Sequence, residues 1–344
     1  MKKIALAIHG GAGTILRSTM TLELELEYRS GLENALGAGW EVLSGGGSAL
    51  DAVERTVCSL EDFHLFNAGR GSVFTGDGKN EMDASIMDGT THDAGAIAFV
   101  RNVKNPVKLA RLVMEKTPHI LLAADGANQF AAEMAVEHAP DEYFFTEHRW
   151  RQLQEAIATG VVQLDHAKGN AECGTRNAES ELNRGNETPA ARIPHSAFRI
   201  PHSKKTPHSK GTVGAVACDG DGNVAAATST GGMTNKKFGR VGDTALIGAG
   251  TYADNGTCAV SCTGHGEFFM IGVTAYDVAA RMKYKDLDLE SAARETLEYL
   301  TELGGEGGFI AVDTRGNVVL PFNCDGMYRG HRTETSESVE IYRD

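Results

Sequence analysis

The chain has 344 residues and a formal net charge of −13, so electrostatics argue against nucleic-acid or anionic-membrane partners. Its 41% hydrophobic content and 41 glycines indicate a globular protein with many tight turns. The apolar stretch 4–8 is too short for a signal sequence, and no later run is long enough to cross a bilayer. We therefore expect a soluble, cytoplasmic enzyme.

The first half of the chain is predicted to alternate strands and helices. A strand at 3–9 comes first, and apolar residues at helical spacing predict helices at 32–43 and 49–60. Ser48 and Asp51 give the second helix a start that resembles a capping box. The later elements expected are a strand pair in 81–89, a helix from Asn105 to Thr117 that Pro118 ends, a strand and turn in 119–127, and a helix around 130–138.

Residues 165–211 differ in composition from everything before them. They hold four of the eight prolines, few hydrophobic residues and three copies of Pro-His-Ser. Such a composition favours a flexible linker, and the solvated histidines are interpreted as part of it rather than as metal ligands. The linker is predicted to span about 165–211.

The second half is predicted to be built from short strands followed by helices. Strands are expected at 212–218, 223–229, 258–263 and 268–274, helices at 276–285 and 289–303, and a hairpin joining 308–313 to 317–322. Asp219, Asp221 and Asn223 resemble the start of a calcium loop. Val224 stands at the glycine position of that motif and Thr230 at its glutamate position, so a hairpin turn is predicted instead.

The six cysteines are scattered without the spacing of a disulfide scaffold. Cys258 and Cys262 form a C-x-x-x-C, but no second pair lies at zinc-ligand spacing. We expect reduced cysteines that behave as small buried hydrophobes, which agrees with a cytoplasmic protein.

The sequence suggests that the peptide bond between Gly211 and Thr212 can cleave itself. Gly211 has no Cβ and tolerates strain, while Thr212 offers a hydroxyl next to the Gly211 carbonyl. If that bond breaks, the new α-amine of Thr212, with a reference pKa of about 7.7 to 8.0, becomes a base for its own hydroxyl. The alternative interpretation of the isolated pair is a strand that begins after a glycine.

The surrounding motifs exclude several familiar sites. In HGGAGT, Leu16 replaces the glycine that a dinucleotide fingerprint requires, and the chain has no G-x-S-x-G elbow or Walker A motif. HGGAGT, LFNAGRGSVFT, EMDASIMDG, GTVGAVA, TSTGGMTNKKFGRVGD, IGAGTYAD and CTGHGE occur in this order. Together they resemble the plant-type L-asparaginase and isoaspartyl aminopeptidase family of N-terminal-nucleophile hydrolases.

The resemblance implies an α+β fold, a four-layer αββα sandwich of the N-terminal-nucleophile hydrolase type. It also implies autoproteolysis between Gly211 and Thr212. Residues 1–211 would then form an α subunit and residues 212–344 a β subunit, which together make one domain. Two such αβ units would associate as a heterotetramer.

The family's functional residues have matches here. Thr212 matches the nucleophile, Thr230 the threonine that orients it, and Thr263 with the Gly264 N–H the oxyanion donors. The remaining matches are Asn67 near the nucleophile, Arg240 for the substrate α-carboxylate, Asp243 for its α-ammonium and Gly266 as a backbone acceptor. Without the flanking motifs, Arg240 and Asp243 could form a surface ion pair, and the two threonines could be ordinary strand residues.

A loop at 60–70 resembles the family's sodium-binding loop, in which backbone carbonyls supply hard oxygen ligands. The expected ligands are the carbonyls of Leu60, Glu61, Phe63, Phe66, Ala68 and Arg70. The charge of Arg70 departs from the family pattern. No cofactor is expected for the chemistry itself, and His9 and His265 are predicted to be structural or rim residues because Thr212 already supplies a base.

The predicted activity is hydrolysis of L-asparagine and β-aspartyl dipeptides to L-aspartate through an acyl-enzyme on Thr212. The nearest alternative is a glycosylasparaginase-like enzyme with a similar threonine site. An alternative of another class is an uncleaved, non-catalytic binding protein.

Overall fold

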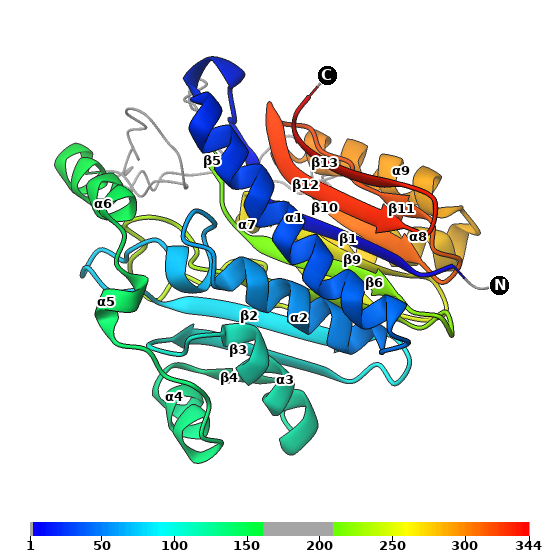
Figure 1. The fold of residues 1–344 in the computed structure, drawn as a ribbon, viewed down its shortest axis with the longest axis horizontal. Helices are drawn as coiled ribbons and strands as arrows, with labels where there is room; N and C mark the ends of the chain where they lie inside the picture. The colour runs from blue at the N-terminus through cyan, green and yellow to red at the C-terminus, as the bar shows by residue number, and fades with distance from the viewer. Residues whose placement is uncertain (1–2, 161–208, 344) are drawn as a thin grey trace, which may run out of the picture.

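The computed structural model describes residues 3–160 and 209–343 (Figure 1). The predicted linker therefore lies outside the described residues up to position 208, as does Cys173. The other five cysteines are buried and not disulfide-bonded. Within the described ranges, no helix combines the length and apolar character that crossing a membrane requires. The chain is a mixed α/β protein, in agreement with the prediction.

The N-terminal part begins with a strand, two long helices and a strand pair. Its elements are β1 (Ala5–Gly13), η1 (Arg17–Thr19), α1 (Leu22–Ser44), α2 (Ala49–Glu61), η2 (Gly69–Gly71), β2 (Met82–Asp88), β3 (Ala94–Val100), α3 (Pro106–Lys116), β4 (Leu121–Ala123), α4 (Ala124–Glu133), α5 (Asp141–Phe144) and α6 (Glu147–Thr159). Ser48 caps α2 by accepting the N–H of Asp51, as the capping pattern predicted.

The C-terminal part is richer in strands. Its elements are β5 (Ser209–Lys210), β6 (Val213–Cys218), β7 (Val224–Thr230), β8 (Thr251–Ala253), β9 (Cys258–Gly264), α7 (Gly266–Gly272), α8 (Thr274–Lys285), α9 (Leu289–Glu302), β10 (Gly307–Asp313), β11 (Val318–Val319), β12 (Gly326–Thr333) and β13 (Glu337–Tyr342). The predicted turn at Asp219 joins β6 to β7, and β10 pairs with β11 as the predicted hairpin requires.

The larger sheet interleaves the two parts of the chain. Among the described residues it has nine strands, ordered β13-β12-β1-β6-β7-β2-β3-β4, with β5 beside β1. β1 therefore lies between two strands of the C-terminal part, and β7 pairs with β2 of the N-terminal part. The pairs are antiparallel except β3 with β4, so neighbouring side chains meet in fixed register across the boundary.

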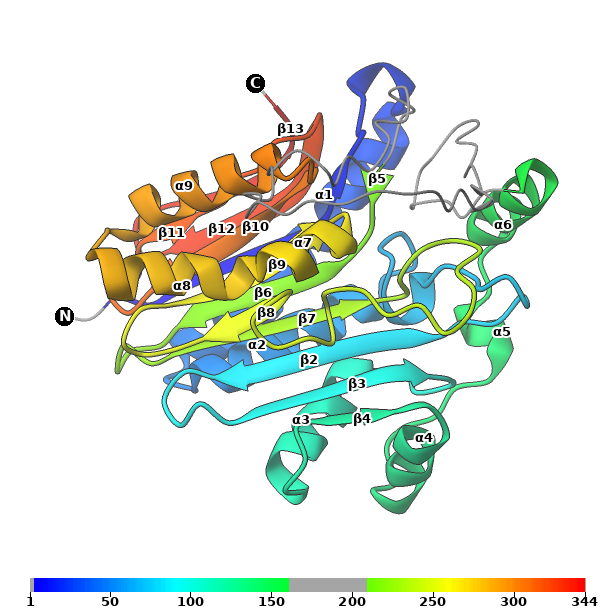
Figure 2. The ribbon, with the colours of Figure 1, turned by 180° about the vertical axis from the view of Figure 1, so that it is seen from behind.

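A second described sheet of four strands, ordered β11-β10-β9-β8, packs against the first through contacts of β9 and β10 with β1, β6 and β7. Helices α1, α2 and α3 cover the outer face of the larger sheet (Figure 1). Helices α8 and α9 cover the outer face of the smaller one (Figure 2). The sheets therefore face each other, and the helices lie outside them.

The alternation of side chains along β1 explains why both of its faces are buried. Leu6 and Ile8 join the core under α1 and α2, whereas Ala5 and Ala7 join the core between the sheets. The inner face of the strand thus carries small residues. Polar side chains share this interior with them, among them His9 at 0% exposure.

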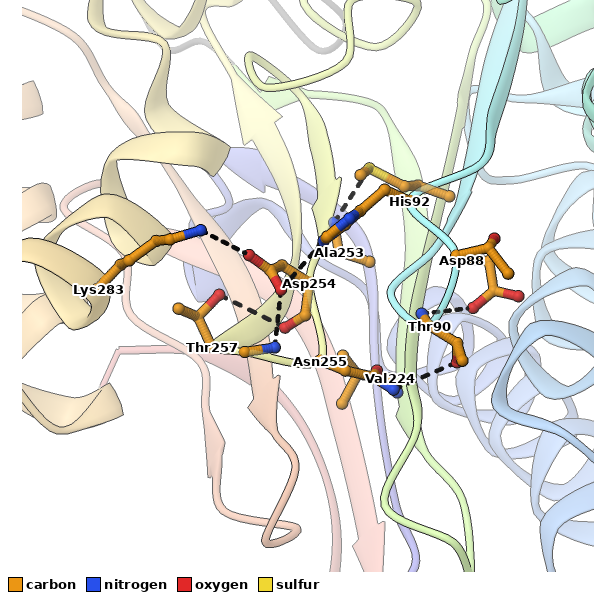
Figure 3. A network of polar contacts seen from close by, with 12 residues as sticks. Asp88, Thr90, His92, Val224, Ala253, Asp254, Asn255, Thr257 and Lys283 are labelled. Carbon is orange, nitrogen blue, oxygen red and sulfur yellow. Dashed lines mark hydrogen bonds and ion pairs between the residues drawn. The ribbon is translucent and has the colours of Figure 1, made fainter.

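A polar network joins two turns beside Val224, the first residue of β7 (Figure 3). The Asn255 side chain accepts the Val224 N–H at 2.9 Å and donates to Thr90 Oγ1 at 3.2 Å. The next residue back, Asp254, pairs with His92 at 3.1 Å and with Lys283 at 3.6 Å. This network holds the β8–β9 turn to the β2–β3 turn, and it leaves the opposite end of β7, at Thr230, for other contacts.

Three local predictions were wrong. The apolar run 268–274 belongs to helices α7 and α8, because Phe268 and Phe269 are buried while Ile271 and Val273 point outward, which is a helical rather than an alternating pattern. The segment 81–89 holds one strand, and its partner lies at 94–100. Helix α4 starts directly after β4, earlier than the predicted 130–138 and without the predicted turn.

Candidate active site

The predicted nucleophile lies at the start of β6, where the antiparallel register brings it beside β7. Val213 pairs with Ser229, so Thr212 lies next to Thr230. The Thr212 hydroxyl donates to Thr230 Oγ1 at 3.2 Å, and both residues are buried, at 7% and 3% exposure. The sheet itself therefore pairs the two hydroxyls.

Two donors converge on the Gly211 carbonyl, the acyl group of the predicted cleavage bond. Asn67 Nδ2 donates to this oxygen at 2.8 Å, and Thr230 Oγ1 donates to it at 3.0 Å. The Asn67 amide is held in that orientation because its Oδ1 accepts the Val73 N–H at 2.9 Å and its Nδ2 also donates to Gly232 O at 2.8 Å. Such a pair of donors stabilises negative charge on a carbonyl oxygen under attack.

Thr263 and Gly264 end strand β9 on the facing sheet. The Thr263 hydroxyl is buried and has no hydrogen-bond partner within the described ranges, so it is available to a substrate oxygen. Gly264 packs directly against helix α7 and the residue before β10, since a Cβ there would lie 2.5 Å from Phe269 and 2.6 Å from Glu306 O. A glycine is required at this position by close approach.

A pocket joins these elements. Its wall contains the predicted nucleophile, its partner and the predicted substrate anchors: Gly211, Thr212, Thr230, Gly232, Met233, Arg240, Gly242, Asp243, Thr244, Gly264 and Gly266. Asn67 and Thr263 are not part of that lining, but Asn67 donates to the carbonyls of Gly211 and Gly232 in the wall, and Thr263 precedes Gly264 on β9. The structure thus gathers residues that lie up to 55 positions apart in the C-terminal part around one cavity.

Arg240 is paired, although its partner is not Asp243. Its Nε donates to Glu267 Oε1 at 2.9 Å and its Nη2 to Glu267 Oε2 at 3.0 Å. A Cβ on Gly242 would lie 2.9 Å from Nη1, and one on Gly266 would lie 3.0 Å from Nη2. Glu267 therefore occupies the edge of the guanidinium formed by Nε and Nη2, while Nη1 faces the pocket wall at Gly242.

Asp243 is buried beside this arginine, with 5% exposure, and its Oδ2 has no hydrogen-bond partner among the described residues. Burial raises the pKa of Asp243 to about 7, against the opposing influence of the Arg240 charge. Gly266 lies over the carboxylate, since a Cβ there would be 2.7 Å from Asp243 Oδ1. A buried carboxylate with an open oxygen is suited to receive an ammonium group.

The predicted sodium loop lies between α2 and η2. The carbonyls of Phe63, Phe66 and Ala68 each accept one backbone N–H, which leaves each with a second lone pair, whereas the Leu60 carbonyl accepts the N–H groups of both Asp62 and Phe63. The Arg70 guanidinium is turned over the Tyr143 ring, 5.6 Å from its centre. No cluster of three or more His, Cys, Asp or Glu side chains suited to a metal was found in the described part of the chain.

A second arginine, which the sequence analysis did not single out, is buried against the same loop. Arg149 of α6 is only 1% exposed, and its Nε donates to Gly71 O at 2.8 Å. Its Nη2 donates to Leu65 O at 3.0 Å. This guanidinium fixes the backbone on both sides of Asn67. Helix α6 was not predicted, so nothing in the sequence pattern pointed to a buried charge there.

His9 and His265, predicted to be structural or rim residues, lie near the site together with Glu267, which was not predicted. His9 Nδ1 lies 3.0 Å from the Thr212 carbonyl oxygen. Glu267 holds Arg240, and His265 lies 3.3 Å from the same carboxylate. Although burial opposes it, the bond from Arg240 holds the pKa of Glu267 below its ordinary value. Glu267 stands directly after the CTGHG run, but no spacing rule links it to an arginine 27 residues earlier.

The site brings two buried threonine hydroxyls, an arginine and a buried carboxylate around one pocket, and the comparisons give the family of the chain. The chain matches the family described as asparaginase over residues 2–341, and it belongs to that family. It is 46% identical over 347 residues to an isoaspartyl peptidase of Salmonella typhimurium, covering 100% of both chains.

Relatives from other organisms give the same result. The chain is 47% identical over 330 residues to a putative isoaspartyl peptidase/L-asparaginase of Dictyostelium discoideum, covering 96% of this chain and 93% of that protein. It is 40% identical over 325 residues to the isoaspartyl peptidase/L-asparaginase of Mus musculus, covering 94% and 86%. The resemblance stated from the motifs is thereby confirmed at the level of the family.

Proposed function

We propose that this protein is a self-cleaving hydrolase that converts L-asparagine and β-aspartyl dipeptides to L-aspartate through an acyl-enzyme on Thr212. The observation that carries the proposal is the Thr212 hydroxyl, which lies beside Thr230 and next to a carbonyl that accepts two hydrogen bonds. The names of the relatives supply the substrate class, and the pocket supplies matching anchors.

Self-cleavage begins when Thr212 Oγ1 attacks the Gly211 carbonyl carbon. Asn67 and Thr230 stabilise the negative charge on the carbonyl oxygen. The C–N bond then breaks, the proton from the hydroxyl ends on the departing nitrogen, and an ester joins Gly211 to Thr212. Water hydrolyses this ester, which releases the Gly211 carboxylate and leaves Thr212 with a free α-amine.

In the cleaved protein, that amine takes the proton from the Thr212 hydroxyl, which attacks the side-chain carbonyl of the substrate. Thr263 and the Gly264 N–H receive the oxyanion. The leaving amine departs with the transferred proton, as ammonia or as an amino acid, and water releases L-aspartate from the ester. Thr230 orients the nucleophile in both reactions.

The free α-carboxylate and α-ammonium of the substrate bind to Arg240 and Asp243. The open edge of Arg240 binds the α-carboxylate, Asp243 binds the α-ammonium, and Gly266 offers its carbonyl. No residue is assigned to what lies beyond the scissile amide, so the leaving group is free to vary. This is why one site accepts both the amide and the dipeptides.

The finer architecture is part of the proposal. The outer helices and facing sheets support a four-layer αββα sandwich of the N-terminal-nucleophile hydrolase type. We propose that 1–211 and 212–344 are its two subunits, that two αβ units associate, and that the 60–70 loop binds sodium through carbonyl oxygens.

The deciding experiment combines intact mass with a substrate panel. A fragment that begins at Thr212, together with turnover of β-aspartyl-leucine and L-asparagine, is expected. N-acetyl-β-aspartyl-leucine should be turned over far more slowly, because Asp243 would lose its ammonium partner. A chain that stays intact indicates the uncleaved binding protein, and preference for glycosylated asparagine indicates the glycosylasparaginase alternative. Equal turnover of the two leucine compounds would refute the role of Asp243.

A further inference from the structure

A continuous series of buried hydrogen bonds runs between the two sheets behind the site. It starts at the Thr212 carbonyl and passes from His9 Nε2 to Ser261 Oγ at 2.9 Å. It continues from Ser261 to Thr228 Oγ1 at 2.7 Å and from Thr228 to Thr251. All four of these side chains are fully buried, at 0% exposure.

The series ends at the opposite side of the pocket. Ser85 Oγ lies 2.8 Å from Thr251 Oγ1 and donates to the Thr244 carbonyl at 2.6 Å. Thr244 lines the pocket and follows Asp243 in the chain. The backbone of the nucleophile is therefore linked through five side chains, each on a different strand, to the backbone of the ammonium anchor.

Chemistry fixes the direction of the bonds at both ends. A carbonyl only accepts, so His9 must carry its hydrogen on Nδ1, which donates to Thr212 O. Burial lowers the pKa of His9 to about 3, so the ring is neutral near pH 7 and Nε2 accepts the Ser261 hydroxyl. Ser85 donates to Thr244 O for the same reason. The series thus donates outward to both backbones.

We propose that His9, Ser261, Thr228, Thr251 and Ser85 are positioning residues that hold the nucleophile and the ammonium anchor in register across the sheet interface. The inference rests on the proposed function and adds to it residues that do not touch substrate. In an interior this tightly packed, a buried hydroxyl with a partner on each side restrains both neighbouring strands. Loss of one link should therefore loosen both ends of the pocket.

The central link is the sharpest place to test this. Thr228→Val keeps the shape of the side chain, removes the hydroxyl and touches neither end of the series. Thr228→Ser retains the hydroxyl and serves as the rescue variant. Thr296→Val is the matched control, because Thr296 is also buried, and its hydroxyl donates to Asp277 of helix α8 at 3.0 Å, away from the series.

In cleaved protein, Thr228→Val should lower kcat for β-aspartyl-leucine about ten-fold and raise its KM several-fold, whereas Thr228→Ser should stay near the parent. Thr296→Val should change the melting temperature only. If Thr228→Val fails to fold, Thr251→Val takes its place with the same expectation. A valine variant that loses stability as the control does but keeps both kinetic constants would overturn the inference.

A readout independent of turnover separates this inference from the proposed function. Nitrogen NMR of labelled histidine should show His9 neutral with its hydrogen on Nδ1, and Ser261→Ala should shift the Nε2 signal by removing its donor. A parent protein that shows this tautomer but hydrolyses none of the substrates would refute only the proposed function. A His9 signal unaffected by Ser261→Ala would refute only the series.

Discussion

Replacing Thr230 with valine tests the self-cleavage geometry most directly. The valine has almost the same volume but removes a hydroxyl with three bonds. This hydroxyl donates to Gly211 O at 3.0 Å and accepts from Thr212 Oγ1 and from the Gly232 N–H, at 3.2 and 3.0 Å. Thr230→Val therefore removes one of two donors to the developing oxyanion and the orienting partner of the nucleophile.

The expected size of the effect follows from the charge on that oxygen. Removal of one oxyanion donor costs about 3 to 4 kcal/mol in other enzymes, which corresponds to a rate about 10² to 10³ times lower. Asn67 still donates to Gly211 O at 2.8 Å, so cleavage should slow without stopping. Thr230→Ser keeps the hydroxyl and should cleave within about ten-fold of the parent.

The assay follows newly made precursor, because the parent is expected to cleave soon after folding. A short pulse of cell-free synthesis, chased and separated on a denaturing gel, gives the rate at which the two fragments appear. Circular dichroism and melting temperature establish that each variant is folded. A folded Thr230→Val precursor that cleaves within two-fold of the parent would show that this hydroxyl does not act on Gly211.

Three further outcomes test other parts of the site. Arg240→Lys should raise KM for β-aspartyl substrates at least about ten-fold while self-cleavage proceeds, because an ammonium group lacks the planar fork that can bind Glu267 and a substrate carboxylate at once. Unchanged kcat and KM would show that Arg240 does not bind the substrate. Asp243 has a pKa of about 7 in the folded protein and about 4 in the unfolded chain, so its ionisation lowers the free energy of unfolding. This loss of stability is absent below about pH 4 and reaches its full size above about pH 7. Urea unfolding of Thr212→Ala precursor should therefore show Asp243→Asn gaining about 2 kcal/mol more at pH 8 than at pH 5, and an equal gain at both would contradict the burial argument. Arg149→Met should lower the free energy of unfolding by about 2 to 4 kcal/mol by leaving two loop carbonyls unpaired, and unchanged unfolding would show that water replaces the guanidinium.

The sequence predicted best those elements whose pattern is local. Helices α2 and α3 have strong periodicity and clear end signals, so their bounds agree closely with the prediction. The run 268–274 misled because five apolar residues close together fit a buried strand as well as a short helix. Strands β12 and β13 were not predicted, since polar residues and glycines interrupt their apolar pattern, and they become strands through the pairing of β12 with β1 and of β13 with β12.

The site was predictable only through the order of its motifs. That order proposed Thr212, Thr230 and Asn67 as neighbours, and the structure brings their side chains together around Gly211 O. The role of Glu267 could not be predicted, because which acid reaches Arg240 depends on how β9 and α7 fold onto the loop. His9 shows the same limit, since its contact with Thr212 spans 203 positions in the chain.

The interleaving of β1 between β6 and β12 has a consequence for the protein's lifetime. A cut at Gly211 leaves both fragments woven into one sheet, so the product stays assembled without any covalent bond between them. Once that sheet is melted, however, its reassembly becomes a second-order encounter of two chains and depends on their concentration. The protein would thus fold once as a single chain and, after activation, be protected chiefly by the slowness of its own unfolding.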